Sequence, residues 1–294
     1  MLWEPSVLLQ LALGGLLAGA LYALLACGLN LVFGVMGVIN LAHGELMIAG
    51  AFLTWLAYRY GELHPLVALP LVMGLLYGFG VLLQRWLIER IAGKDELTSL
   101  LVTYGLSIIL MNLGLLVFSA DFKSVPALQG GFYLQGLDLV ISKPRAVAGA
   151  VSLALTLGIF GFLQYHPLGK AIRAVSEQPE VAMICGIDVS RIRQMTFGIA
   201  AAMAGAAGAM LTILYSFSPE TGGEFLLKCF AIIVIGGMGN FLGALLGGLL
   251  LGLAEAFVGG FFNAQWAEAM AYLLLVLVLL LRPSGLLGHR HAVS

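Results

Sequence analysis

The sequence has very little charge. Of its 294 residues, 14 are Lys or Arg and 15 are Asp or Glu, so only 10% are charged, whereas 61% are hydrophobic. Soluble domains carry about 25% charged residues, most of them on the surface. This scarcity excludes a water-soluble globule and predicts that lipid covers most of the surface. A formal net charge of −1 also excludes nucleic acid as a partner, because such binding needs a basic face that releases counterions.

Paired cysteines and catalytic motifs are also missing. Cys27, Cys185 and Cys229 stand apart without a CxxC pair, which excludes a disulfide framework and gives no support to a metal site. The HExxH and GxSxG patterns of two classes of hydrolase do not occur, so we expect no enzymatic activity and no cofactor. The phosphate-binding P-loop is absent too. If ATP drives this protein, a separate chain must therefore bind and hydrolyse it.

Long apolar segments dominate what is present. A helix needs about 20 apolar residues to cross a bilayer, and the stretch from Pro5 to Tyr58, with Glu45 as its only charge, is long enough for two. Further apolar segments cover 65–84, 97–118, 146–164, 194–216, 225–258 and 264–281. The segment 225–258 is too long for one crossing, so we interpret it as two. The sequence thus predicts an all-α polytopic membrane protein, one transmembrane domain over 1–294 with about eight or nine transmembrane helices and glycine-broken segments.

The distribution of Lys and Arg predicts the orientation, because short cytoplasmic loops are enriched in both. Nine cations fall on one side of the predicted spans: Arg85, Arg90, Lys94, Lys170, Arg173, Arg191, Arg193, Arg282 and Arg290. Four fall on the other side, namely Arg59, Lys123, Lys143 and Arg145, and Lys228 near a span end is left unassigned. Residues 165–193 are therefore expected to form a cytoplasmic loop, and residues 119–145 an external one.

The first glycine-rich break lies between residues 33 and 45. Polar residues there interrupt an apolar run: Asn40, His43 and Glu45 follow Gly34 and Gly37. A carboxylate in a membrane persists where it is protonated, paired or facing water, and an unwound helix is tolerated where it lines a cavity. These five residues are therefore expected to line a translocation path. The alternative is structural, with Glu45 near a membrane face and paired with His43 across one turn.

A second break repeats the first at an offset of 202 residues. Residues 235–240 echo residues 33–38, and pairs of glycine-interrupted segments are typical of transport sites in repeat-built carriers. The glycines expected to break or pack these helices are Gly236, Gly237, Gly239, Gly243 and Gly247. Their spacing of four residues favours close helix packing. For Glu255, further along the same segment, a direct role and snorkelling to the membrane interface both remain open.

The cytoplasmic loop 165–193 carries helix signals. Pro179 suits a first helical position, Gly186 suits a left-handed cap, and Asp188 suits the N-cap of the next span. A short helix over 179–185 is therefore predicted. It would expose three apolar side chains, those of Val181, Met183 and Ile184. Such a face favours docking into a groove of a partner protein, and the alternative is that the helix lies flat in the lipid headgroup layer.

Four stretches together resemble one known family. The run from Gly28 to Glu45, GLNLVFGVMGVINLAHGE, is similar to a signature of permease subunits from the branched-chain amino-acid family of ABC importers. Residues 169–174 with 186–188, the glycine run 236–248 and the ending 282–286 resemble the same family in the same order. The family also includes urea and short-amide permeases.

The resemblance implies a multi-pass permease in the bacterial inner membrane that forms half of a translocation path. Its expected partners are a second permease, homologous or identical, two ATP-binding subunits and a periplasmic substrate-binding protein. The cargo is implied only as a class: leucine, isoleucine and valine, other small amino acids, or amides. The family's coupling loop for the ATPase maps onto Gly169, Arg173, Pro179, Val181, Met183, Ile184 and Gly186.

Another transport class remains open from the residues alone. In a proton-coupled secondary transporter, Glu45 would exchange a proton with His43, and no ATPase would be needed. A membrane-embedded enzyme would need a hydrolytic pair or a metal set, which the sequence does not offer.

Overall fold

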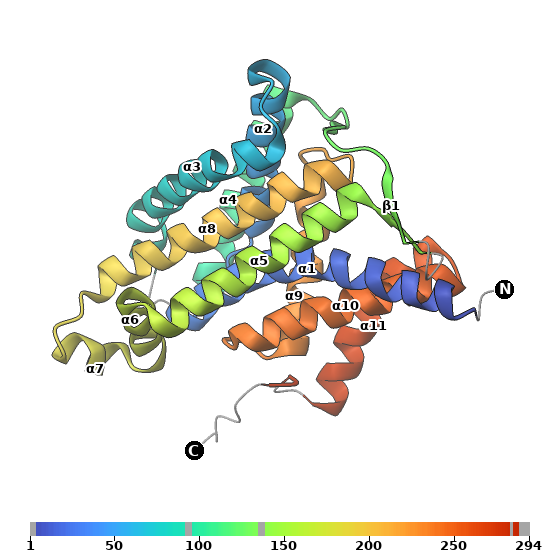
Figure 1. Ribbon diagram of the computed structural model, residues 1–294. Coiled ribbons are helices and arrows are strands. Elements are labelled where there is room, and N and C mark those ends of the chain that lie inside the picture. Colours follow the sequence, from blue (N-terminus) through green and yellow to red (C-terminus); the bar gives the residue numbers. More distant parts are fainter. Residues whose placement is uncertain (1–3, 92–95, 135–138, 283–284, 288–294) are drawn as a thin grey trace.

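The computed structural model describes residues 4–91, 96–134, 139–282 and 285–287, and these residues are almost entirely helical (Figure 1). The helices of the first half are α1 (Pro5–Met36), α2 (His43–Gly61), α3 (Pro65–Trp86), the 3₁₀-helix η1 (Ile88–Arg90) and α4 (Glu96–Phe118). A hairpin, β1 (Gly131–Leu134) and β2 (Leu139–Ser142), precedes α5 (Lys143–Tyr165). The remaining helices are α6 (Pro167–Glu177), α7 (Pro179–Ile184), α8 (Val189–Leu214), α9 (Thr221–Gly236), α10 (Phe241–Phe261) and α11 (Ala264–Leu281).

The predicted polytopic all-α membrane architecture is confirmed. Every predicted apolar segment forms a helix, and the long segment 225–258 is divided into α9 and α10. Within the described residues, seven helices are long and apolar enough to cross a membrane: α1, α3, α4, α5, α8, α10 and α11. The predicted eight or nine exceeds this number because α9 has 16 residues, about 24 Å of helix against about 30 Å of hydrocarbon. The other predicted span that is not among the seven is α2. It has 19 residues, but it includes His43, Glu45 and Arg59 and is therefore less apolar.

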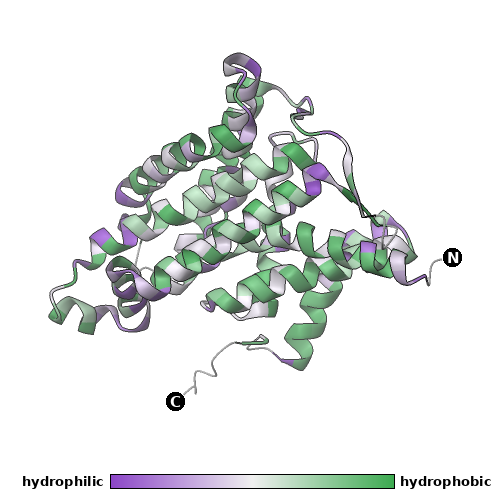
Figure 2. Ribbon diagram, in the orientation of Figure 1, coloured by the Kyte–Doolittle hydropathy of each residue, from purple (hydrophilic) through white to green (hydrophobic). Residues whose placement is uncertain are grey.

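Burial separates inner helices from peripheral ones. Most of α1, α2 and α8 is buried inside the protein, whereas α4 and α11 have few buried residues. Apolar residues also cover much of the outer helices (Figure 2). The exposed face of α3 carries Val67, Leu71, Leu75 and Phe79, and that of α11 carries Leu273, Val276, Leu277 and Leu280. In a membrane protein these faces contact lipid or another subunit, because lipid is itself apolar and the side chains need not be buried inside the protein.

Small residues allow the inner helices to approach closely. Along α1 and α10, a Cβ placed on Gly19 would lie 2.7 Å from the carbonyl oxygen of Gly248. A Cβ on Gly15 would lie at the same distance from the carbonyl oxygen of Gly252. Since helices in lipid associate largely by van der Waals contact, such backbone-to-backbone packing holds α1 against α10.

The predicted external loop contains the hairpin, which the sequence analysis did not anticipate. Strands β1 and β2 pair antiparallel from Gly131 with Ser142 to Leu134 with Leu139. Before the hairpin, the Lys123 N–H donates to the Phe217 carbonyl at 2.8 Å, and the Phe217 N–H donates back at 2.9 Å. The loop is therefore held on the connection between α8 and α9.

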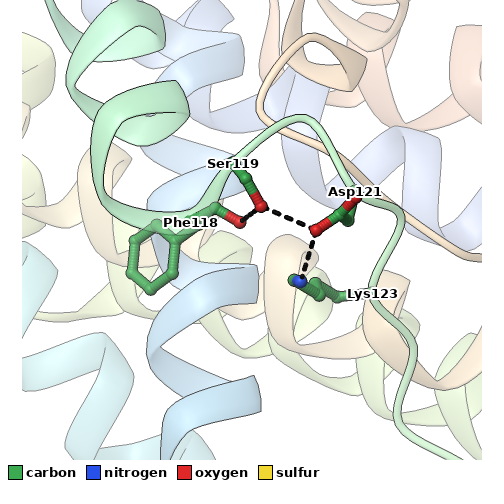
Figure 3. A network of polar contacts seen from close by, with 4 residues as sticks. All are labelled: Phe118, Ser119, Asp121 and Lys123. Carbon is green, nitrogen blue, oxygen red and sulfur yellow. Dashed lines mark hydrogen bonds and ion pairs between the residues drawn. The ribbon is translucent and has the colours of Figure 1, made fainter.

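A polar network fixes the start of this loop (Figure 3). The Ser119 hydroxyl donates to Asp121 Oδ2 at 2.7 Å, and Lys123 Nζ lies 3.5 Å from the same oxygen. The hydrogen bond from Ser119 and the Lys123 charge together lower the pKa of the Asp121 carboxyl, which therefore stays ionised. The network is exposed, so its contribution is local.

Candidate functional site

The first glycine break ends α1 at Met36. Gly37 follows with φ +64°, a left-handed conformation that glycine adopts without a Cβ clash, and its N–H donates to the Phe33 carbonyl at 2.8 Å. Gly34 remains inside the helix, so the expected unwinding there is wrong. The Gly34 carbonyl instead accepts a hydrogen bond from Ser176 Oγ of α6 at 2.5 Å. The end of α1 is thereby attached to α6, in the loop predicted to be cytoplasmic.

The polar residues of the first break gather at the start of α2, and all are buried. Asn40 Oδ1 accepts the Ala42 N–H at 3.1 Å, and His43 Nε2 lies 3.1 Å from the Leu25 carbonyl of α1. Asn40 Nδ2 and His43 Nδ1 have no hydrogen-bond partner among the described residues. Buried polar atoms are nearly always hydrogen-bonded, so these two nitrogens are candidate contacts for a polar group from outside this chain.

Glu45 does not pair with His43. Its Oε1 accepts a hydrogen bond from Ser107 Oγ of α4 at 3.2 Å. Its Oε2 faces the first turn of α9, where a Cβ on Gly222 would lie 2.7 Å from it. The carboxylate thus lies in the first turn of α2 and against the first turn of α9, and both helix N-termini favour negative charge. The alternative of a His43–Glu45 pair across one turn is wrong.

The second break lies directly against the first. A Cβ on Gly34 would lie 3.3 Å from the Gly239 Cα. Asn30 of α1 reaches the second break with both ends of its amide: Oδ1 accepts the Gly239 N–H, and Nδ2 donates to the Asn240 carbonyl, each at 2.7 Å. The two segments that echo each other 202 residues apart are therefore neighbours in space.

The glycines around the second break serve close packing. Gly236 at the end of α9 lies backbone to backbone with Gly243 of α10, and a Cβ on Gly247 would lie 2.8 Å from the Ile232 carbonyl. Gly237 ends α9 with φ +103°. Asn240 caps α10, because its Oδ1 accepts the Gly243 N–H at 2.9 Å.

Residues 285–287 complete this break, a role that sequence reasoning missed. The N–H groups of Leu286 and Leu287 donate to the carbonyls of Ile235 and Gly236 at 2.8 and 3.1 Å. Asn240 Nδ2 donates to the Leu287 carbonyl at 2.9 Å. Carbonyls at a helix C-terminus lack partners within the helix, so the turn 285–287 satisfies the end of α9. We call this turn the C-terminal clasp.

The short helix predicted in loop 165–193 forms over Pro179–Ile184, within one residue of the predicted range. Gly186 has φ +83°, and the Ile187 N–H donates to the Ala182 carbonyl at 3.0 Å. Asp188 caps α8 as expected, because its Oδ1 accepts the Arg191 N–H at 3.0 Å. The three apolar side chains lie exposed, with fractions of 50% for Val181, 62% for Met183 and 85% for Ile184.

Two other residues assigned to the coupling loop lie elsewhere in it. Gly169 is buried where α6 turns back on α5, and a Cβ there would lie 2.5 Å from the Leu163 Cα. Arg173 donates from Nη1 to Gln164 Oε1 at 2.9 Å and so joins α6 to the end of α5. Both residues position α6 within this chain, and α7 alone presents the apolar surface.

A polar cluster within the helices also escaped prediction. Lys228 Nζ of α9 lies 3.0 Å from Glu255 Oε1 of α10, and the Tyr22 hydroxyl of α1 donates to Glu255 Oε2 at 2.8 Å. Glu255 therefore points into the protein and does not snorkel to the interface. The available signal was one cation and one carboxylate in two adjacent apolar segments, which favours an ion pair.

Comparisons with known proteins agree with this architecture. The family model described as "Branched-chain amino acid transport system / permease component" matches residues 11–279. The chain is 35% identical to the high-affinity branched-chain amino acid transport system permease protein BraD of Pseudomonas aeruginosa, with 95% of each chain covered. It is 32% identical to the permease protein LivH of the corresponding Escherichia coli system, again with 95% of each covered. LivM of Escherichia coli is 29% identical over 91% of this chain and 68% of its own length. The chain belongs to the branched-chain amino acid transport permease family of ABC transporters.

Proposed function

We propose that this chain is a permease subunit of an ATP-driven importer for branched-chain amino acids or related small amino acids and amides. It forms half of the translocation path in a bacterial inner membrane, beside a second permease, two ATP-binding subunits and a periplasmic binding protein. Family membership supports the cargo class. The likeness to two differently named permeases of one Escherichia coli system, LivH and LivM, supports the second permease.

The exposed helix α7 is the observation that carries the proposal. A six-residue helix with Val181, Met183 and Ile184 turned outward buries only Ala182 within the chain. Two capping turns hold it firmly between α6 and α8. An exposed apolar helix face is typical of a helix that docks into a groove of a partner, and an ATPase subunit on the cytoplasmic side is the partner proposed here.

The polar residues at the start of α2 support a path for a polar cargo. Asn40 and His43 leave buried nitrogens without a partner in the described residues, and Glu45 lies where two helices begin. Ionisable residues inside membrane proteins commonly mark substrate or ion pathways. In this proposal these three residues shape the path and do no covalent chemistry.

Co-purification of the chain with its ATPase tests the docking role. Met183→Asp places a carboxylate in the proposed apolar contact, and a desolvated unpaired charge costs several kcal/mol, so we expect the ATPase to be lost from the complex. Met183→Leu keeps the apolar surface and serves as the control, for which unchanged co-purification is expected. Retention of the ATPase by Met183→Asp would contradict the proposal.

The energy source separates this proposal from a proton-coupled transporter. Reconstituted complex should accumulate leucine only with ATP, and collapse of the proton gradient should leave uptake unchanged. Glu45→Gln retains size and most hydrogen bonding but removes the titratable proton, so uptake by this variant should remain ATP-dependent. Gradient-driven accumulation by this chain alone would overturn the assignment.

A further inference from the structure

The Tyr22–Lys228–Glu255 cluster has features that a purely structural contact between helices does not need. The side chains of Lys228 and Glu255 are 18% and 12% exposed, so they are neither sealed in the core nor open at the surface. A buried ion pair is weak evidence for stability, because an apolar pair of similar volume is often as stable. A charge pair kept within apolar helices is therefore a candidate for function.

The surroundings of the Lys228 ammonium form a binding niche for an ammonium group. Lys228 Nζ lies 5.0 Å from the ring centroid of Tyr22 and 5.8 Å from that of Phe225. It also lies 3.0 Å from the Glu255 carboxylate and 3.4 Å from the Tyr22 hydroxyl. Aromatic faces together with a carboxylate are the groups that recognise ammonium ions.

The outer face of α9 differs from lipid-facing helix surfaces. Exposed Glu224 and half-exposed Leu227 lie one turn or less before Lys228 on this face. By contrast, the middle of the exposed face of α11 is apolar, with Leu273, Val276 and Leu277. Because a charge in the hydrocarbon core is unfavourable by about 2.5–3.5 kcal/mol on insertion scales, the first two turns of α9, which carry Glu224 and Lys228, fit an aqueous surface better than lipid.

We propose that Lys228 and Glu255 recognise the zwitterionic head of the transported amino acid. The substrate carboxylate contacts Lys228, and the substrate ammonium contacts Glu255 and the rings of Tyr22 and Phe225, in the niche that the Lys228 ammonium occupies without substrate. Lys228 and Glu255 pair with each other before the substrate binds and after it leaves, so neither charge is left unpaired in the membrane. This inference rests on the proposed function, because it assumes an amino acid as cargo.

Removal of both charges together tests the proposal in the reconstituted complex. The double variant Lys228→Gln/Glu255→Gln leaves no unpaired charge, so we expect assembly and melting temperature close to wild type. Leucine uptake should fall at least ~10-fold, since each charge-assisted contact contributes more than a neutral one. The control is the ion pair of Lys123 with the exposed Asp121 in the loop after α4, as Asp121→Asn/Lys123→Gln, for which unchanged uptake is expected.

Thiol labelling tests the aqueous path without altering the charge pair. In a Cys185→Ser background, Leu227→Cys should react with a water-soluble charged thiol reagent, and excess leucine should slow the reaction. Leu277→Cys on α11 is the control, because its side chain is exposed to the same extent, 52% against 51%, on the apolar face. It should stay unlabelled.

The outcomes separate the two proposals. If the wild-type complex does not accumulate leucine, the proposed function falls and this inference falls with it. If the wild type accumulates leucine and the neutral double variant does so equally, only the inference is overturned. An unreactive Leu227→Cys overturns it as well, even if the double variant fails to assemble.

Discussion

The side-chain carbonyl of Asn30 accepts a hydrogen bond from the backbone N–H of Gly239 at 2.7 Å, across 209 positions of sequence. The amide nitrogen of the same side chain donates to the adjacent Asn240 carbonyl. One buried side chain of α1 therefore provides a partner for the Gly239 N–H between α9 and α10 and adds a second hydrogen bond to the Asn240 carbonyl, which also accepts the Ala244 N–H of α10. This contact joins the two glycine breaks, which sequence periodicity alone presents as independent features.

Replacing Asn30 tests this junction. Asn30→Leu keeps a side chain of similar size but leaves the Gly239 N–H without its partner and removes one of the two hydrogen bonds that the Asn240 carbonyl accepts. Each lost hydrogen bond contributes about 0.5–1.5 kcal/mol. We expect a lower melting temperature of the purified protein and a comparable loss of uptake. Asn112→Leu is the control, because Asn112 is exposed on α4 and bonds only the Ile108 carbonyl of its own helix. Equal melting temperatures for the two variants would contradict the role given to Asn30.

The packing of α9 against α10 predicts a strong difference between two glycines. A Cβ on Gly243 would overlap the backbone of Gly236, whereas a Cβ on Gly74 of α3 would meet nothing within 4 Å. Overpacking a close contact costs about 1–3 kcal/mol, so Gly243→Ala should lower folded yield and melting temperature. Gly74→Ala should leave both within error or raise them slightly. If Gly243→Ala leaves folded yield and melting temperature unchanged, the close contact between the α9 and α10 backbones is not needed for stability.

The helices were predictable because lipid imposes a simple rule. A run of about 20 apolar residues has to be helical, since every backbone polar group must find its partner inside the segment. The caps at Gly186 and Asp188 follow from equally local chemistry, and the structure forms both. The paired strands Gly131–Leu134 and Leu139–Ser142 lie outside the long apolar runs, where this rule does not apply, and their pairing depends on a register that composition does not indicate.

The contacts within the candidate site were not predictable in the same way. Sequence reasoning selected His43 and Glu45 as unusual residues, but their partners, the Leu25 carbonyl and Ser107, lie on other helices. The Lys228–Glu255 pair depends on how α9 folds back on α10. Such pairings come from tertiary packing, and a single sequence contains no periodic signal for them.

The orientation of the chain can be tested with a native residue. Cys185 is exposed just after α7, whereas Cys27 and Cys229 are buried. With the coupling loop in the cytoplasm, a membrane-impermeant thiol reagent should leave intact cells unlabelled and should label Cys185 once the cells are permeabilised. Gln129→Cys, exposed in the loop before β1, should react in intact cells. The reverse pattern would invert the topology and place α7 away from any cytoplasmic ATPase.

The C-terminal clasp gives the last prediction. A Cβ on Gly285 would lie 2.6 Å from the Gly237 nitrogen, and Gly285 has φ +77°, so Gly285→Ala cannot keep the turn in place. The Ile235 and Gly236 carbonyls would then lose the N–H groups of the clasp, at about 0.5–1.5 kcal/mol for each hydrogen bond. We expect faster amide hydrogen exchange in residues 285–287 and a lower melting temperature.

Leu287→Ala separates the backbone of the clasp from its side chains. Leu287 is 41% exposed, and its N–H and carbonyl make the same hydrogen bonds with any residue except proline at that position. This variant should therefore exchange and melt like the wild type. If Gly285→Ala also exchanges and melts like the wild type, the end of α9 is stable without the clasp. If Leu287→Ala is as damaging as Gly285→Ala, the side chain and not the backbone of this turn holds the second break.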